Sequence, residues 1–126
     1  MCAAALQLYH FAWILLLLNK PAAAHNDQRS VSSVLRSYRE VLEKAACHSR
    51  EICGIALARP KGAVRVQMQQ PLYLAGLCLD TPGDRKVVLD LLRDIEADTG
   101  CPTEFRVHQL LNEWDLEEDS TAATLQ

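Results

Sequence analysis

The chain has 126 residues, of which 49% are hydrophobic and 23% charged, and its formal net charge is −3. This length suits one small domain, and this composition is that of a globular protein, which excludes an intrinsically disordered chain. Glycine, proline and aromatic residues are few, and long runs rich in leucine, alanine, glutamate and arginine favour helices over strands.

Charge is divided unevenly along the chain. Residues 1–78 hold nine lysines and arginines against four acidic residues, whereas residues 79–126 hold four against twelve. Solvated charged faces explain this asymmetry, and attraction between the two parts is a second explanation. A nucleic-acid-binding chain would carry a denser basic cluster interleaved with aromatic residues.

The first segment, residues 1–19, is apolar almost throughout, and we expect it to form a buried core helix. At helical spacing Tyr9, Trp13 and Leu16 or Leu17 share one face. A helix that is apolar all round needs neighbours on several sides, so we expect this face to be covered.

A secretory signal or membrane anchor is the alternative for this segment, because its apolar run is followed by three alanines at positions 22–24. The basic start of a signal is missing, and the run is short for a membrane span of about 20 residues. If residues 1–24 were removed, four cysteines would remain. That even number is compatible with two disulfides in a small secreted helical protein.

Residues 20–28 read as a loop, and Ser30 or Ser32 is suited to cap the helix that follows. That helix is long and amphipathic, with a bend expected near His48 and Ser49. Its apolar residues recur by threes and fours at Val31, Val34, Leu35, Tyr38, Val41, Leu42, Ala45, Ala46, Ile52, Ile55 and Ala56.

Residues 59–62 end this helix and lead into a connection. Within that connection, residues 64–68 hold the one strand-like alternation of the chain. Pro71 is suited to the first turn of the next helix, where its missing N–H is no loss.

Capping residues in the sequence predict where the next two helices begin and end. Thr81 is suited to the N-cap, Pro82 to the first helical position and Asp84 to the capping carboxylate. Gly100 is suited to the C-cap, and Thr103 lies at the start of the last helix. The expected apolar stripes are Val87, Val88, Leu91, Leu92 and Ile95 in the first helix and Phe105, Val107, Leu110, Leu111 and Trp114 in the second.

We therefore predict an all-α fold of about five helices packed as an irregular bundle, an incomplete piece of a larger helical domain. Residues 1–115 form the helical domain. Residues 116–126 are acidic and then rich in serine, threonine and alanine, and we expect a flexible tail there.

Candidate chemistry is sparse. The five cysteines, Cys2, Cys47, Cys53, Cys78 and Cys101, form no C-x2-C pair, so their spacing predicts no metal site and favours buried thiols in a reducing compartment. No glycine-rich phosphate loop and no H-E-x-x-H motif occurs either. We predict no catalytic, cofactor-binding, metal or DNA-binding residue, and no cofactor.

Cys47 and His48 are the nearest approach to a nucleophile and a base. Adjacent helical residues point about 100° apart, however, which disfavours a hydrogen bond between their side chains. We expect His10, His25 and His108 to be surface or half-buried residues. Met68 and the aromatic residues Tyr73, Phe105 and Trp114 are expected to fill the core.

Several of these residues together resemble the C-terminal part of the regulatory region carried by fungal zinc-cluster transcription factors. The resemblance lies in Gln70-Pro71-Leu72, Ala75-Gly76, Asp84-Arg85, Leu91-Leu92, Ile95-Glu96, Thr99-Gly100, Thr103, Arg106, Leu110-Leu111 and Glu113-Trp114, and more loosely in Trp13 to Leu16 and Cys53 to Ala56. It covers most of the chain. It is a pattern of packing and capping residues.

The resemblance implies a non-enzymatic role in transcriptional regulation in the nucleus. It implies protein partners, either the transcription machinery or related factors, and a small effector as a further ligand. The six-cysteine DNA-binding cluster of that family is absent from this sequence, so we expect no direct DNA binding. Because the first segment is short for a membrane span, we also expect no membrane association. Three explanations of the missing zinc cluster stay open: a truncated product, a fragment, or a stand-alone partner of longer relatives.

Overall fold

The computed structural model describes residues 2–19, 30–58 and 63–125, and side chains as far as Glu118. Within these ranges the chain is all-α and contains no strand, as predicted. The helices are α1 (Ala3–Leu18), α2 (Val31–Leu57), α3 (Ala63–Gln67), α4 (Gln69–Cys78), α5 (Pro82–Thr99) and α6 (Glu104–Leu125). Five of them are long, and α3 is a single short turn. The loops predicted at residues 20–28 and 59–62, and His25, lie outside the described residues.

The predicted helix boundaries are confirmed at three caps. The Ser30 hydroxyl accepts a hydrogen bond from the backbone N–H of Ser33 at the start of α2. Thr81 accepts one from the N–H of Asp84 at the start of α5. Gly100 ends α5 with a φ of 75°, a left-handed conformation in which a side chain would be strained.

The core is shared by α2, α4, α5 and α6, with one contribution from α1. Its buried hydrophobic residues are Ile14, Ala45, Ile52, Cys53, Ala56, Met68, Leu72, Ala75, Leu79, Val88, Leu91, Leu92, Ile95, Val107, Leu110 and Trp114. The predicted stripe of α5 is confirmed at its buried positions, and Met68 and Trp114 fill the core as expected. Tyr73 is half-buried against it.

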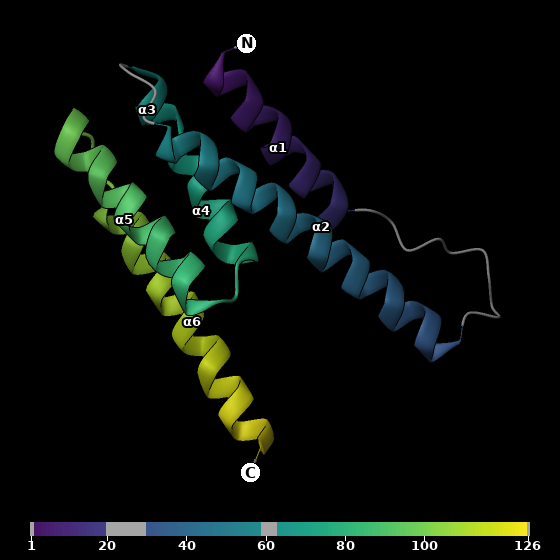
Figure 1. Cartoon of the computed structure of the whole chain (residues 1–126). Helices are drawn as coiled ribbons and strands as arrows, with labels where there is room; N and C mark the ends of the chain where they lie inside the picture. The colour runs from purple at the N-terminus through teal and green to yellow at the C-terminus, as the bar shows by residue number, and fades with distance from the viewer. Residues whose placement is uncertain (1, 20–29, 59–62, 126) are drawn as a thin grey trace.

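The prediction for α1 is wrong in its orientation. Tyr9, Trp13 and Leu16 are 56%, 42% and 66% exposed, and the face that packs carries the buried residues Gln7 and Ile14. Figure 1 shows α1 lying along α2 with its other side open. Because the helix is apolar all round, its sequence does not define which face is covered, and one buried amide decides it. The Gln7 side chain donates to the backbone carbonyl of Ile52 at 3.1 Å.

Residues 64–67, which carry most of the strand-like alternation noted in the sequence, lie in helix α3, in agreement with the all-α prediction. The buried Arg65 side chain of α3 donates to Asp94 and Asp98 of α5, each at 2.6 Å. An arginine that is 6% exposed must be paired, and the two carboxylates stand one helical turn apart on α5 to receive it. In α3 the contacts of Arg65 with the two carboxylates of α5, and not the alternating valines, fix how the segment packs.

The last helix differs from expectation at both ends. Phe105 is 51% exposed, and Leu111 lies at the surface, so the buried stripe of α6 is narrower than predicted and consists of Val107, Leu110 and Trp114. The helix also continues to Leu125, beyond the end expected near Asp115. The division into a domain at residues 1–115 and a flexible tail stays a prediction.

Helices α4 and α6 are locked together at Gly76. The indole N–H of Trp114 donates to the Gly76 carbonyl at 3.1 Å, and a Cβ at Gly76 would come within 2.9 Å of the Leu110 side chain. Arg85 lies over the Trp114 ring, 4.9 Å from its centroid. The glycine thus permits the close approach that the tryptophan completes.

Candidate interaction surface

Helix α2 carries one apolar stripe along its whole length, and only half of that stripe is covered. Ala45, Ser49, Ile52 and Ala56 are buried against neighbouring helices. The same stripe continues toward the N-terminus as Val31, Leu35, Tyr38 and Leu42, which are 76%, 49%, 62% and 43% exposed. We call residues 31–44 the α2 arm and these four side chains the exposed seam.

The α2 arm projects beyond the other helices, as Figure 1 shows. A helix of 27 residues is about 40 Å long at 1.5 Å per residue, longer than the body against which it packs. Helix α1 also exposes large apolar residues, namely Leu8, Tyr9, Trp13, Leu15, Leu16 and Leu18. Exposed apolar patches on soluble proteins often mark interaction sites.

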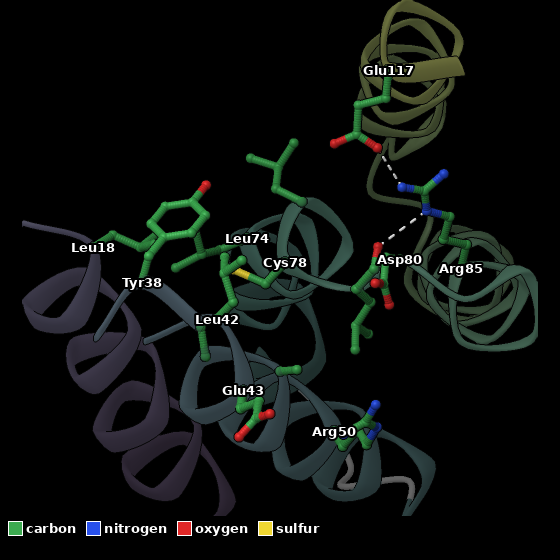
Figure 2. A pocket seen from close by; sticks show the side chains of 14 residues that line it. Leu18, Tyr38, Leu42, Glu43, Arg50, Leu74, Cys78, Asp80, Arg85 and Glu117 are labelled. Carbon is green, nitrogen blue, oxygen red and sulfur yellow. Dashed lines mark hydrogen bonds and ion pairs between the residues drawn. The ribbon is translucent and has the colours of Figure 1, made fainter. Parts of the chain in front are cut away.

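A groove of about 600 Å³ lies at the base of the α2 arm. Figure 2 shows Leu18, Tyr38, Leu42 and Leu74 gathered on one side of it. Its wall combines the exposed seam with the end of α1 and one face of α4.

The opposite side of the groove is charged. Asp80, Arg85 and Glu117 lie there, and Arg85 donates both to Glu117 and to the Leu79 carbonyl. Glu43 and Arg50 also line the groove, and Arg50 pairs with Asp84 at 3.5 Å. The groove therefore suits an amphipathic occupant, with apolar groups toward α2 and polar groups toward α6.

A pair of histidines joins α1 to the part of α2 that follows the arm. The Nδ1 atoms of His10 and His48 lie 2.9 Å apart, and the Trp13 ring stacks on His48 at 5.8 Å between centroids. Burial lowers the pKa of His48, His10 lowers it further, and Glu51 acts in the opposite direction. A hydrogen bond between two imidazoles needs a neutral ring, which this lowered pKa favours.

His48 therefore has a structural partner, and that partner is not the adjacent cysteine. Cys47 is exposed on the same helix, so the arrangement of nucleophile and base that we disfavoured from sequence is not formed. His10 is half-buried and His108 exposed, as expected.

The five cysteines are free and lie in different environments. Cys2 and Cys47 are exposed, contrary to the expectation of buried thiols, whereas Cys53 is buried and Cys78 and Cys101 are half-buried. Burial, and to a smaller extent the nearby charge of Asp84, raise the pKa of Cys53 to about 11. Burial also raises the pKa of Cys78, against an opposing hydrogen bond from Ser49. Neither thiol has the depressed pKa of a reactive cysteine.

Among the described residues, no group of three or more histidine, cysteine, aspartate and glutamate side chains has the arrangement of a metal site. None of the described helices combines the length and the hydropathy that crossing a bilayer requires. The prominent surface of the described chain is thus an apolar one, formed by the exposed seam, α1 and the groove. Sequence periodicity found the stripe of α2 but carried no signal that half of it would lie beyond its partners.

The chain is similar to a known fungal regulator. It is 42% identical over 123 residues to a protein described as transcription activator AMTR1 from Alternaria alternata. The match covers 98% of this chain and 16% of that protein, so the chain spans less than a fifth of its relative's length. No family model matches the chain, and no solved structure matches it.

This similarity supports the coarser part of the resemblance inferred from sequence, namely a region of a fungal transcription factor. Residues that carry the resemblance occupy contacts between helices. Gln70 accepts from Arg106 at 2.9 Å, Thr103 donates to the Leu92 carbonyl at 2.7 Å, and Gly76 meets Trp114.

Proposed function

We propose that this chain is a non-enzymatic regulatory and protein-interaction region of the fungal transcription-activator type, acting in the nucleus. The observation that carries the proposal is the 42% identity over 98% of the chain to a transcription activator. The exposed apolar residues of α1 and the α2 arm support an interaction role, because exposed apolar patches often mark protein–protein contacts.

The proposed partners are proteins, either the transcription machinery or related factors. A small effector is a further proposed ligand of this region. The chain is proposed to act without binding DNA itself, because its cysteines lack the spacing of a zinc cluster and its basic residues are dispersed.

A reporter assay in a fungal host tests the regulatory role. The chain, fused to an unrelated DNA-binding domain, should change transcription of a reporter that carries the matching operator. The control is the same fusion with Leu92→Asp, which places a carboxylate at a fully buried core position and unfolds the domain. Equal reporter output from both fusions and from the DNA-binding domain alone would refute the regulatory role.

The alternative of a small secreted helical protein is tested separately. N-terminal sequencing of the chain from its native source should give a start at Met1 or Cys2, and imaging should place it in the nucleus. A start near His25 together with protein in the medium would favour the secreted alternative. Titration of thiols under denaturing conditions is independent of both measurements. Five reactive thiols are expected for the nuclear form.

A further inference from the structure

We propose that the α2 arm is a self-association surface, through which two copies of this chain pair their α2 helices antiparallel about a twofold axis. The first ground is continuity with an interface that the helix already makes. The buried residues Ala45, Ser49, Ile52 and Ala56 pack against helices of the same chain. The exposed seam is the uninterrupted extension of that packing surface.

The spacing of the stripe determines what kind of partner fits it. Its members are separated alternately by four and three residues, in the order Val31, Leu35, Tyr38, Leu42, Ala45, Ser49, Ile52 and Ala56. This is the average spacing of about 3.5 residues by which helices interdigitate along a shared seam. The natural occupant of the exposed seam is therefore another helix.

The exposed seam is complementary to its own reverse. When a second arm lies antiparallel, with its centre opposite the junction of Arg36 and Ser37, Val31 packs against Leu42 of the second copy and Leu35 against Tyr38 of the second copy. The twofold axis repeats both contacts, which gives four apolar layers. Every member of the exposed seam is covered once.

The edges of the seam are compatible with the same register. Val34 and Val41 flank one edge, and Ser32 and Arg39 flank the other, at the positions that neighbour the layers in a helical repeat. Antiparallel pairing brings Val34 beside Val41 of the second copy and Ser32 beside Arg39 of the second copy. No like charges meet at either edge.

The shape of the molecule leaves room for this pairing. The α2 arm extends away from α4, α5 and α6 (Figure 1), so antiparallel arms place the two bodies at opposite ends. The overlap spans 12 residues, or about 18 Å. The groove receives the N-terminal end of the second arm, because Leu42 lines it together with Leu18 and Leu74. With so short a seam, we expect a reversible dimer with a Kd in the micromolar range.

Sedimentation equilibrium of the whole chain, from submicromolar to submillimolar concentration, measures the proposed equilibrium. The wild type should fit a monomer and dimer. Tyr38→Glu should raise the dimer Kd at least tenfold, because it buries a carboxylate in a central layer. Ser37→Glu adds the same charge on the same exposed turn but away from the seam, and it should leave the dimer Kd within about twofold. Circular dichroism should show equal helicity for all three proteins.

Two further variants test the orientation. Ser32→Glu places a carboxylate beside Arg39 of the second copy and should lower the dimer Kd about two- to fivefold at low salt, whereas Ser32→Lys should raise it by a similar factor. Adding Arg39→Glu to Ser32→Lys should restore the wild-type Kd. In parallel pairing the edge that carries Ser32 would lie beside the Val34 and Val41 edge of the second copy, so Ser32→Glu would gain no contact with Arg39 and would not lower the dimer Kd.

Three outcomes would overturn the proposal. The first is a monomer at all concentrations, and the second is a dimer that Tyr38→Glu and Ser37→Glu affect equally. The third is a monomeric chain whose exposed seam is protected from hydrogen exchange only by an unrelated apolar helix peptide, which would identify a different protein as the occupant.

Discussion

The helices at the two ends of the chain use similar apolar residues in different ways. In α4, α5 and α6, residues such as Leu72, Leu92 and Leu110 are fully buried, and polar contacts such as the hydrogen bond from the Trp114 indole to the Gly76 carbonyl fix how the helices meet. In α1 and the α2 arm, large apolar side chains face outward. The difference shows that amphipathic pattern determines helix formation, whereas coverage depends on where neighbouring helices end.

Paired leucine substitutions should give the largest contrast between the regions. Leu92→Ala, at a fully buried position on α5, should lower the free energy of unfolding by about 2–5 kcal/mol, because it removes buried methyl groups and leaves a cavity. Leu35→Ala, on the α2 arm, should cost less than about 1 kcal/mol. Urea denaturation at low protein concentration measures both. Equal losses would mean that the arm is covered in the monomer.

The same glycine-to-alanine substitution at two positions compares a glycine in the core with a glycine in open space. Gly76→Ala should destabilise the chain by about 1–3 kcal/mol, since the new Cβ would overlap Leu110 and crowd Val88 inside the core. Gly54→Ala, in the last turn of α2, meets nothing within 4 Å and should stabilise the chain by about 0.5–1 kcal/mol. Thermal unfolding should therefore shift in opposite directions. A shift in the same direction would contradict the close approach of α4 and α6.

Loss of a single cap should have a smaller effect. Thr81→Ala removes the hydroxyl that accepts from the Asp84 N–H and should cost about 1 kcal/mol of unfolding free energy. Thr81→Ser retains the hydroxyl and is the matched control. If the serine variant loses as much as the alanine variant, the side chain contributes by packing and the cap is not the cause.

The smallest expected effect is a pH dependence of α1 docking. Because the folded state lowers the pKa of His48, the unfolded state binds more protons between that lowered pKa and the ordinary value near 6.5. Stability should therefore rise with pH through this window and fall as pH decreases. Groups that face the His48 ring are His10, Trp13 and Glu51.

The slope is measured as the urea midpoint between pH 5 and about pH 7.5. His48→Asn should reduce the slope, and His108→Asn, at an exposed position on α6, should leave it as in the wild type. An unchanged slope in His48→Asn would show that another group dominates the proton linkage.

Local chemistry predicted this fold where it acts over a few residues. Caps at Ser30, Thr81 and Gly100 were readable because a hydroxyl three residues before an orphan N–H, or a glycine after an amphipathic stretch, has one common structural use. The orientation of α1 was not readable, since an apolar helix without a polar face offers no preferred side. The helical conformation of α3 depended on carboxylates about 30 residues away, which no local pattern encodes.

The candidate surface was only half predictable for the same reason. Periodicity identified the apolar residues from Val31 to Ala56 as one stripe, but nothing in that period distinguishes the half that meets other helices from the half that does not. The pairing of His10 with His48 was likewise hidden, because it depends on how α1 is aligned along α2.

The alignment of α1 along α2 depends on one buried polar side chain in a helix that is otherwise mainly apolar. The Gln7 amide reaches the Ile52 carbonyl in a buried setting, and sliding α1 by one turn would strand it away from water at a cost of about 1–3 kcal/mol. An apolar segment of similar length could pack on α2 through its methyl groups in several alignments. An amide at this position favours the one alignment in which it reaches the Ile52 carbonyl. Gln7 thus fixes the position of α1 along α2, which apolar contacts alone would leave free to slide.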